Sequence, residues 1–186
     1  MRVAFLAYDE IAPWNWAAST PGTAALKQEL VVEDVRRARA SADLVVVGMS
    51  FGIEYQADPT ASQRALAAAA IDAGATLVVG NHPHVVEAIE RRTVSDAGTP
   101  REAFVIYAQG NYIFDQSWSV PTTQAAMLEA GFVDGRLIGY RLRPVVTRGN
   151  AALARGLYRP ELVSPAGPEG RAILGRIWDA QDRLPR

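Results

Sequence analysis

The first eighty residues alternate between continuous apolar runs and amphipathic segments. Residues 2–8 and 44–49 are apolar runs typical of buried strands, and residues 77–80 form a third run that closes on a glycine. Between these runs, residues 27–39 and 66–71 carry apolar side chains at helical spacing. The resulting β-α-β-α-β order predicts parallel strands joined by right-handed crossovers.

The ends of the second helix are marked by local sequence signals. Thr60 and Gln63 have the spacing of a capping box at the start of a helix. Gly74 supplies the residue type that commonly ends one. The pattern therefore predicts a helix between these positions.

The second half of the chain predicts mixed strands, a hairpin and a C-terminal helix. Residues 104–108 form a further apolar strand, and residues 169–182 place an apolar stripe on a helix. Two apolar runs, 125–133 and 136–146, flank an Asp-Gly pair, which is the strongest short signal for a two-residue hairpin.

Three segments predict irregular structure. Residues 91–101 are polar and contain Gly98 and Pro100, so we expect a loop or turn. Residues 148–170 predict an irregular connection, and residues 9–22 a long loop whose tryptophans, Trp14 and Trp16, we expect to pack against the domain.

Composition narrows the classes of function. A chain of 186 residues suits one domain, 1–186, and a net charge of -1 gives no support for nucleic-acid binding. The absence of cysteine excludes disulfides and thiolate metal ligands. No apolar run is long enough for a membrane span and no signal peptide opens the chain, so the sequence as written predicts a cytoplasmic location.

The two histidines of the chain, His82 and His84, follow the strand at 77–80 on either side of Pro83. Ligands of parallel α/β sheets bind beyond the carboxyl ends of the strands. Pro83 should push His82 toward an extended conformation and so stiffen the loop. Imidazole is the commonest protein ligand for metals, so the pair predicts a partial metal site, although loop histidines also serve as surface or hydrogen-bonding residues.

Other polar residues follow neighbouring strands. Glu54 lies in the loop after residues 44–49, and its alternative role is a solvated side chain. Asn111 and Asp115 follow the strand at 104–108, where they could supply oxygen ligands or ordinary turn chemistry.

Four stretches in the same order carry a resemblance to a known family. Residues 50–55 (S-F-G-I-E-Y) resemble its H-W-G-x-E-Y, and residues 80–85 (G-N-H-P-H-V) its G-x-H-P-H-V. Residues 109–116 resemble its L-G-N-F-x-F-D-Q, and residues 66–74 its A-x-x-x-I-D-A-G. From residue 2 to about 180, the chain resembles the C-terminal half of the CapA-type poly-γ-glutamate capsule biosynthesis proteins, which are similar to calcineurin-like metallophosphoesterases.

The resemblance implies a fold, a metal site and a cellular location. It implies one lobe of a metallophosphoesterase-like α/β sandwich and association with the cell envelope. It implies that His82 and His84 serve different ions, Mn, Zn or Fe, of a dinuclear centre. It also implies candidate substrate-binding residues around them: Ser50, Glu54, Asn81, Asn111 and Asp115.

Two departures predict an incomplete centre. Ser50 replaces the family's histidine, Phe51 replaces its tryptophan, and the N-terminal half that supplies the G-D, N-x-E and N-H stretches is absent. Two close cations need anionic ligands to offset their repulsion, yet only Glu54, Asp9 and Asp115 stand in strand-end loops. We expect weak binding of at most one divalent ion, and no catalysis by the isolated chain.

Three interpretations remain open on the sequence alone. The chain could be an enzyme lobe whose N-terminal half comes from a separate polypeptide. It could instead be a non-catalytic binding lobe for an anionic polymer or phosphate-like ligand, or a truncated reading frame. If the resemblance holds, apolar surface shaped to pack against the missing lobe predicts self-association or a protein partner, whereas a stable monomer would favour the binding lobe.

Overall fold

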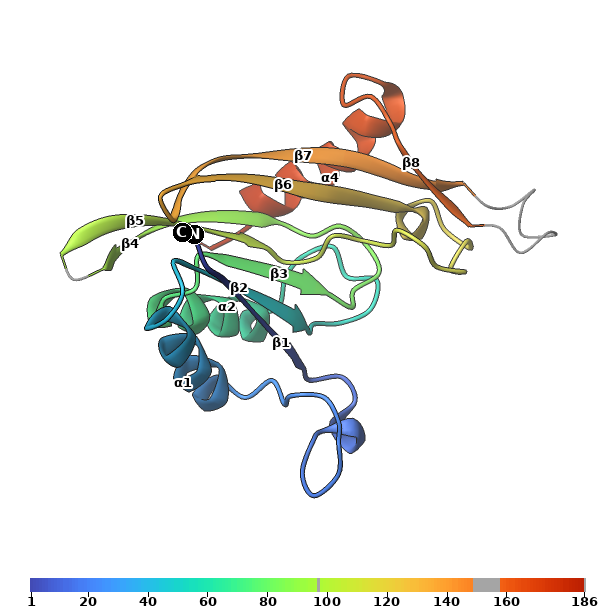
Figure 1. Ribbon diagram of the computed structural model, residues 1–186. Helices are drawn as coiled ribbons and strands as arrows, with labels where there is room; N and C mark the ends of the chain where they lie inside the picture. Colours follow the sequence, from blue (N-terminus) through green and yellow to red (C-terminus); the bar gives the residue numbers. More distant parts are fainter. Residues whose placement is uncertain (97, 149–157, 186) are drawn as a thin grey trace.

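The protein is an α/β sandwich in which two sheets lie one above the other (Figure 1). This computed structural model describes residues 1–96, 98–148 and 158–185. The larger sheet carries helices on one face, and the smaller sheet lies over part of its other face (Figure 1). The expected α/β class is confirmed.

The larger sheet has five strands in the order β1-β2-β3-β5-β4. Four of them are parallel, and β4 joins antiparallel to β5. The strands are β1 (Val3–Asp9), β2 (Leu44–Ser50), β3 (Leu77–Asn81), β4 (Ile89–Asp96) and β5 (Thr99–Ile106). This order brings the carboxyl ends of β1, β2 and β3 to one edge, where the candidate site lies.

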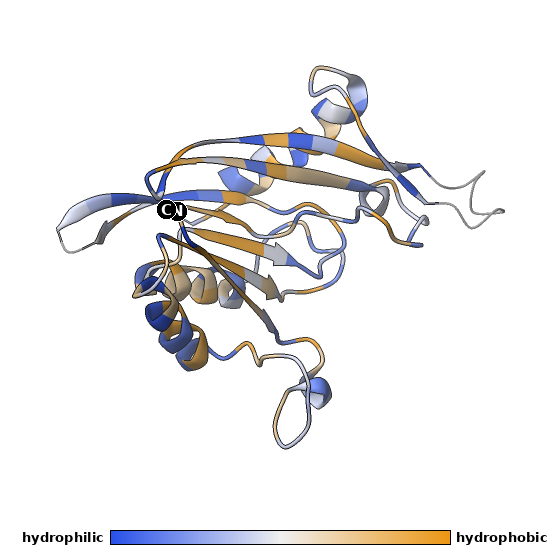
Figure 2. Cartoon of the chain, in the orientation of Figure 1, coloured by the Kyte–Doolittle hydropathy of each residue, from blue (hydrophilic) through white to orange (hydrophobic). Residues whose placement is uncertain are grey.

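Helices α1 (Gln28–Arg39) and α2 (Ala61–Ala73) cover one face of this sheet (Figure 1). The apolar stripe of α1 faces the sheet and its polar side faces solvent (Figure 2), and its Val31 and Val35 are fully buried. The predicted capping box is present at the start of α2, because Thr60 and Gln63 exchange hydrogen bonds.

The smaller sheet has three antiparallel strands in the order β6-β7-β8. Its strands β6 (Gln124–Val133) and β7 (Arg136–Arg148) form the predicted hairpin around Asp134-Gly135. Helix α4 (Pro168–Asp182) packs against β4, β6 and β7, and its buried Ile173 and Ile177 complete the second apolar core. Within the described residues, neither this helix nor the other two could cross a membrane.

Two segments expected to be irregular contain strands. Residues 91–96 belong to β4 and residues 99–101 to β5, and Arg91 and Thr93 both hydrogen-bond Glu102 across the pair. The region 148–170 contains β8 (Arg159–Leu162), while residues 149–157 lie outside the described residues. In both cases cross-strand polar pairs replace the apolar pattern on which the prediction relied.

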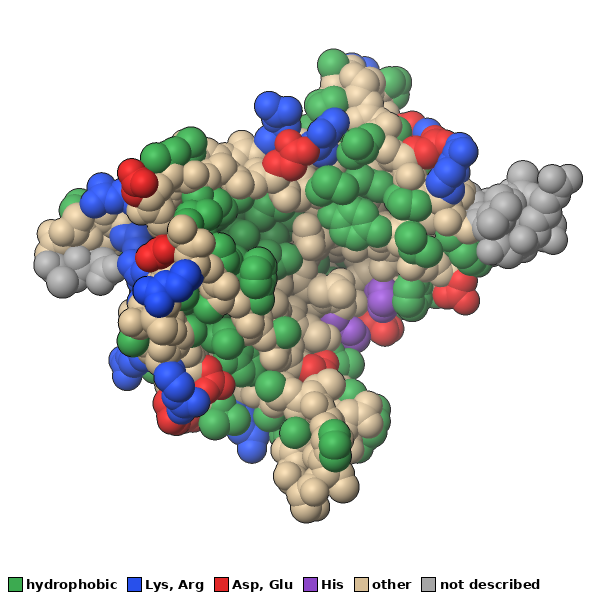
Figure 3. Space-filling model, in the orientation of Figure 1, with side chains coloured by type: hydrophobic (Ala, Val, Ile, Leu, Met, Phe, Trp, Pro, Cys, Tyr) green, Lys and Arg blue, Asp and Glu red, His purple; other side chains and the backbone are tan. Residues whose placement is uncertain are grey.

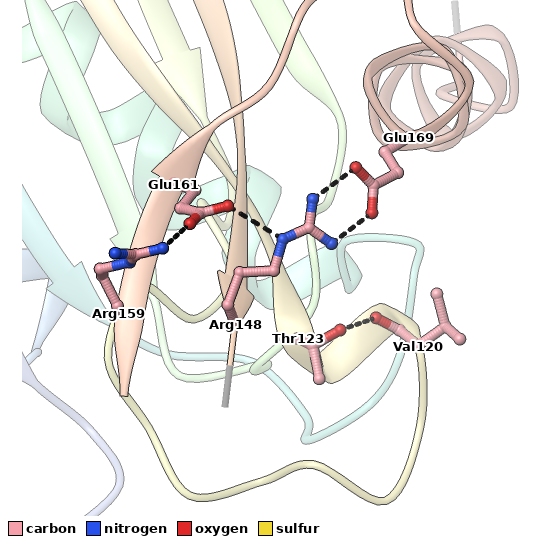
Figure 4. A network of polar contacts seen from close by, with 6 residues as sticks. All are labelled: Val120, Thr123, Arg148, Arg159, Glu161 and Glu169. Atoms are coloured by element: carbon pink, nitrogen blue, oxygen red, sulfur yellow. Dashed lines mark hydrogen bonds and ion pairs between the residues drawn. The ribbon is translucent and has the colours of Figure 1, made fainter. Parts of the chain in front are cut away.

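A surface ion-pair network ties β7, β8 and α4 together (Figure 4). Arg148 on β7 forms a two-pronged contact with Glu169 of α4, at 2.6 and 2.7 Å, and its Nε donates to Glu161 of β8 at 3.1 Å. The fork geometry of guanidinium and carboxylate favours this arrangement. The network therefore links the C-terminal helix and the smaller sheet at the protein surface, where such pairs contribute little to stability.

Apolar side chains are exposed at the β1 edge of the sandwich. Strand β1 has one neighbour, β2, and its Phe5 is 76% exposed. Figure 3 shows hydrophobic side chains gathered in the hollow between the two sheets. The expectation that both loop tryptophans pack against the domain is wrong for Trp14, which is 79% exposed, whereas Trp16 donates its indole N–H to the Asp9 carbonyl.

Candidate metal centre

The candidate site lies at the carboxyl ends of the parallel strands, where three loops meet. The loop after β2 carries Glu54, the loop after β3 carries His82 and His84, and the segment after β5 carries Asn111. A backbone hydrogen bond from Tyr55 N–H to the Pro83 carbonyl, at 2.8 Å, joins the first two loops directly.

Glu54, His82 and His84 form a compact cluster of metal-ligand types. One ligand atom from each residue lies within 4.8 Å of the others, and His84 Nε2 is 3.7 Å from Glu54 Oε1. The two imidazole rings have centroids 5.8 Å apart. Figure 3 shows both histidines at the surface, with acidic side chains beside them.

The backbone of these loops adopts conformations that most residues avoid. The φ angles of Tyr55, His82 and His84 are 63°, 102° and 62°. The expected extended conformation of His82 before Pro83 is therefore wrong. Left-handed backbone at residues other than glycine costs free energy, and such strain is concentrated at functional sites.

Close contacts flank these loops. A Cβ on Gly80 would lie 1.8 Å from the Tyr107 carbonyl oxygen, so only glycine fits at that position of β3. Glu10 accepts a hydrogen bond from the Gly52 N–H at 2.9 Å and so fixes the loop after β2. The sequence analysis did not identify Glu10, because nothing in its local pattern links it to a loop 42 residues away.

His84 is enclosed on several sides. Its ring stacks on Tyr55 with centroids 5.9 Å apart and lies 4.9 Å from the ring of Phe114. Its Nδ1 is 2.9 Å from Asn111 Oδ1. Asn111 is 7% exposed, so the structure places it behind the imidazole and not on the open side of the cluster.

The remaining predicted residues lie near the cluster without joining it. The Ser50 carbonyl accepts from Glu10 N–H at the end of β2, and the exposed Asn81 pairs with Ser50 in the sheet register. Asp115 is exposed. Both carboxylate oxygens of Asp9 accept hydrogen bonds from backbone N–H groups of the following turn. These contacts direct the Asp9 side chain to its own loop.

Burial and neighbouring charges act in opposite directions on His82. Burial lowers the pKa of its imidazole, and the nearby carboxylates of Glu54, Asp9 and Glu10 partly offset this effect. A lowered pKa keeps the ring neutral at physiological pH, which is the form that binds metals.

A buried carboxyl group lies beneath the site. Glu87 is fully buried, its Oε2 accepts from Gln63 Nε2 at 2.8 Å, and its Oε1 has no hydrogen-bond partner among the described residues. Burial raises the pKa of Glu87 to about 8. Gln63 in turn lies directly under Gly52, whose Cβ would approach its amide group to 2.6 Å.

The donor set suits a divalent transition metal. Two imidazoles and one carboxylate, with one side open to solvent, match the three-ligand arrangement of many metal sites. Within the described residues, Glu54, His82 and His84 are the one group of histidine and acidic side chains with this spacing.

Comparison with known proteins places the chain in a family. The family model described as bacterial capsule synthesis protein PGA_cap matches residues 1–116. The chain belongs to the PGA_cap family. The matched region contains the whole Glu54–His82–His84 cluster and ends at Gln116.

Two curated proteins of Bacillus are similar to this PGA_cap chain. The PGA biosynthesis protein CapA of Bacillus subtilis (strain 168) is 39% identical over 121 residues, and the capsule biosynthesis protein CapA of Bacillus anthracis is 32% identical over 125 residues. Each alignment covers 64% of this chain. The aligned part spans 30% and 28% of the two relatives.

Proposed function

We propose that this chain is a metal-binding lobe that acts in the biosynthesis of a capsule polymer of the poly-γ-glutamate type. Membership of the PGA_cap family and the names of the two Bacillus relatives support the capsule role. The observation that carries the metal-binding part is the Glu54–His82–His84 cluster, with its ligand atoms within 4.8 Å of one another.

The cluster suits a single divalent ion. A bound ion would supply Lewis-acid stabilisation of a phosphoryl or carboxyl oxygen. Glu54 contributes the one anionic ligand of the cluster, and a second cation nearby would need more negative charge than this carboxylate provides. A complete dinuclear centre would therefore require ligands from another polypeptide or from a second copy of this chain.

Direct binding of an anionic polymer without metal is the weaker alternative. Glu54, Asp9 and Glu10 all act on His82 as nearby negative charges. A carboxylate polymer approaching these residues would meet repulsion unless a cation lay between them. The same acidic surroundings favour the cation, so metal and polymer would bind in that order.

Isothermal titration calorimetry with Mn²⁺ and Zn²⁺ tests the proposal. We expect one site per chain with a dissociation constant weaker than about 1 μM, because three protein ligands hold a divalent ion incompletely. His84→Ala and Glu54→Gln should each abolish the measurable heat. Glu33→Gln, at an exposed position on α1, is the matched control and should bind as the wild type does.

Two results would contradict the proposal. Binding that persists unchanged in His84→Ala and Glu54→Gln would show that the ion binds elsewhere. Two tight sites on the isolated chain would show that it contains ligands outside the cluster.

A further inference from the structure

The orientation of the Asn111 side chain is fixed by a backbone carbonyl. Its amide nitrogen lies 3.0 Å from the Thr122 carbonyl oxygen, which can only accept a hydrogen bond. The group facing Thr122 must therefore be the NH₂ of Asn111. The same NH₂ donates to Gln116 Oε1 at 3.1 Å, and all three residues are at least nine-tenths buried.

This orientation determines which nitrogen of His84 carries a proton. With its NH₂ directed at Thr122, Asn111 presents Oδ1 to His84 Nδ1 at 2.9 Å. Two acceptors cannot form this hydrogen bond, so Nδ1 must be the donor. In the neutral ring, Nε2 then keeps its lone pair, and Nε2 is the atom that faces Glu54 Oε1.

We propose that Asn111 is a positioning residue: its carboxamide fixes the His84 proton on Nδ1 and so presents Nε2 as the ligand atom of the cluster. The second half of this statement rests on the proposed metal binding, whereas the first half concerns the protein alone. Outer residues of this kind orient ligating histidines and raise their basicity.

The network continues beyond Asn111 and explains why its side chain cannot rotate. Gln116 accepts from Asn111 through Oε1 and donates through Nε2 to the Tyr55 hydroxyl at 3.0 Å. Tyr55 stacks on His84, so the chain of contacts returns to the imidazole. Turning over the Asn111 amide would place its oxygen against the Thr122 carbonyl and break the contacts on both sides.

The smaller sheet holds the backbone of the same segment. The hydroxyl of Thr147 on β7 lies 3.2 Å from the Asn111 carbonyl and 2.6 Å from the Tyr112 carbonyl. Thr147 is buried, so these contacts are shielded from water. Both the side chain and the main chain of Asn111 are therefore anchored.

Nitrogen NMR on the metal-free chain tests the tautomer directly. Long-range ¹H–¹⁵N correlation spectra distinguish protonated from unprotonated ring nitrogens, and with two histidines in the chain, His82→Ala assigns the signals. At a pH where the rings are neutral, we expect His84 in the Nδ1–H form. Asn111→Leu should lose this form, because leucine offers Nδ1 no acceptor.

Zinc affinity provides the second measurement. Asn111→Leu should weaken Zn²⁺ binding by about 10- to 100-fold, the usual effect of removing an outer partner of a ligating histidine. Tyr112→Phe is the matched control on the residue next to Asn111, since it removes the contacts of the Tyr112 hydroxyl with Gln109 Oε1 and the Ala126 carbonyl and none with His84. It should leave both the tautomer and the zinc affinity unchanged.

The outcomes separate this inference from the proposed function. An Nε2–H form in the wild type, or an unchanged tautomer in Asn111→Leu, would overturn the role of Asn111. Equal losses of affinity in Tyr112→Phe and Asn111→Leu would also overturn it, since the effect would then be general destabilisation. An Nδ1–H form in a chain that binds no Zn²⁺ would support the tautomer assignment and overturn metal binding alone.

Discussion

Replacing Glu87 by glutamine should remove a pH-dependent loss of stability. The pKa of the buried Glu87 carboxyl is raised from 4.5 to about 8, mainly by burial, so the folded protein retains a proton that the unfolded chain releases. Below pH 4.5 both states are protonated and no difference arises. Between these two pKa values stability falls as pH rises, and above about pH 8 the full loss is present.

The size of the effect follows from the same two pKa values. The difference between 4.5 and about 8 corresponds to as much as about 5 kcal/mol of unfolding free energy. Glu87→Gln keeps the shape and the acceptor for Gln63 but cannot ionise. The variant should therefore match the wild type near pH 5, or be slightly less stable, and become progressively more stable than the wild type toward about pH 9.

Urea unfolding followed by circular dichroism measures this difference. At each pH, the free energy of unfolding of the wild type is subtracted from that of the variant. The contributions of the other titrating groups are the same in both proteins and cancel in this difference. The control is Glu33→Gln, whose side chain is 67% exposed and should change stability by less than about 0.5 kcal/mol at any pH. A difference for Glu87→Gln that does not vary with pH would refute the argument, since it would mean that Glu87 is ionised in the folded protein.

Four further predictions concern other parts of the molecule. Gly80→Ala should lower the free energy of unfolding in urea by about 1–3 kcal/mol or more, because its Cβ would collide with the Tyr107 carbonyl; wild-type stability would contradict the close approach. Phe5→Ser should reduce concentration-dependent association measured by light scattering, because it removes exposed apolar surface; a wild type that stays monomeric at high concentration would contradict a partner at this edge. Glu169→Gln should cost less than about 1 kcal/mol and less still in high salt, as expected for an exposed ion pair, and a large salt-independent loss would show the network to be structural. The isolated chain should show no metal-dependent phosphodiesterase turnover, because its cluster has one carboxylate; turnover that His84→Ala abolishes would mean that further ligands are recruited.

The elements that bury an apolar face could be predicted from the sequence, and those that do not bury one could not. Strands β1, β2 and β3, the three helices and the β6–β7 hairpin all follow from periodicity, caps and the Asp-Gly turn. Strand β4 was missed because it is an edge strand paired through residues such as Arg91 and Glu102, which leave no apolar alternation. Strand β8 is also an edge strand, and its Glu161 is paired with two arginines.

The candidate site was predictable in its ligand types but not in its geometry. His82 and His84 stood out because the chain has two histidines and both follow a strand. Their left-handed backbone conformations have no counterpart in hydrophobic periodicity. The contact between Asn111 and His84 depends on how two loops 27 residues apart approach one another, which local sequence does not specify.

The anchoring of Asn111 by the smaller sheet has a consequence for how this chain can diverge. Thr122 and Thr147 lie beyond residue 116, outside the part that matches the family model, yet they fix the residue behind His84. Most of the β6–β7 surface is therefore free to change during evolution, while the Thr147 hydroxyl and the path of the chain at Thr122 are not. In an alignment of close relatives, we expect Thr147 and the segment around Thr122 to change where Asn111 changes and to be kept where Asn111 is kept.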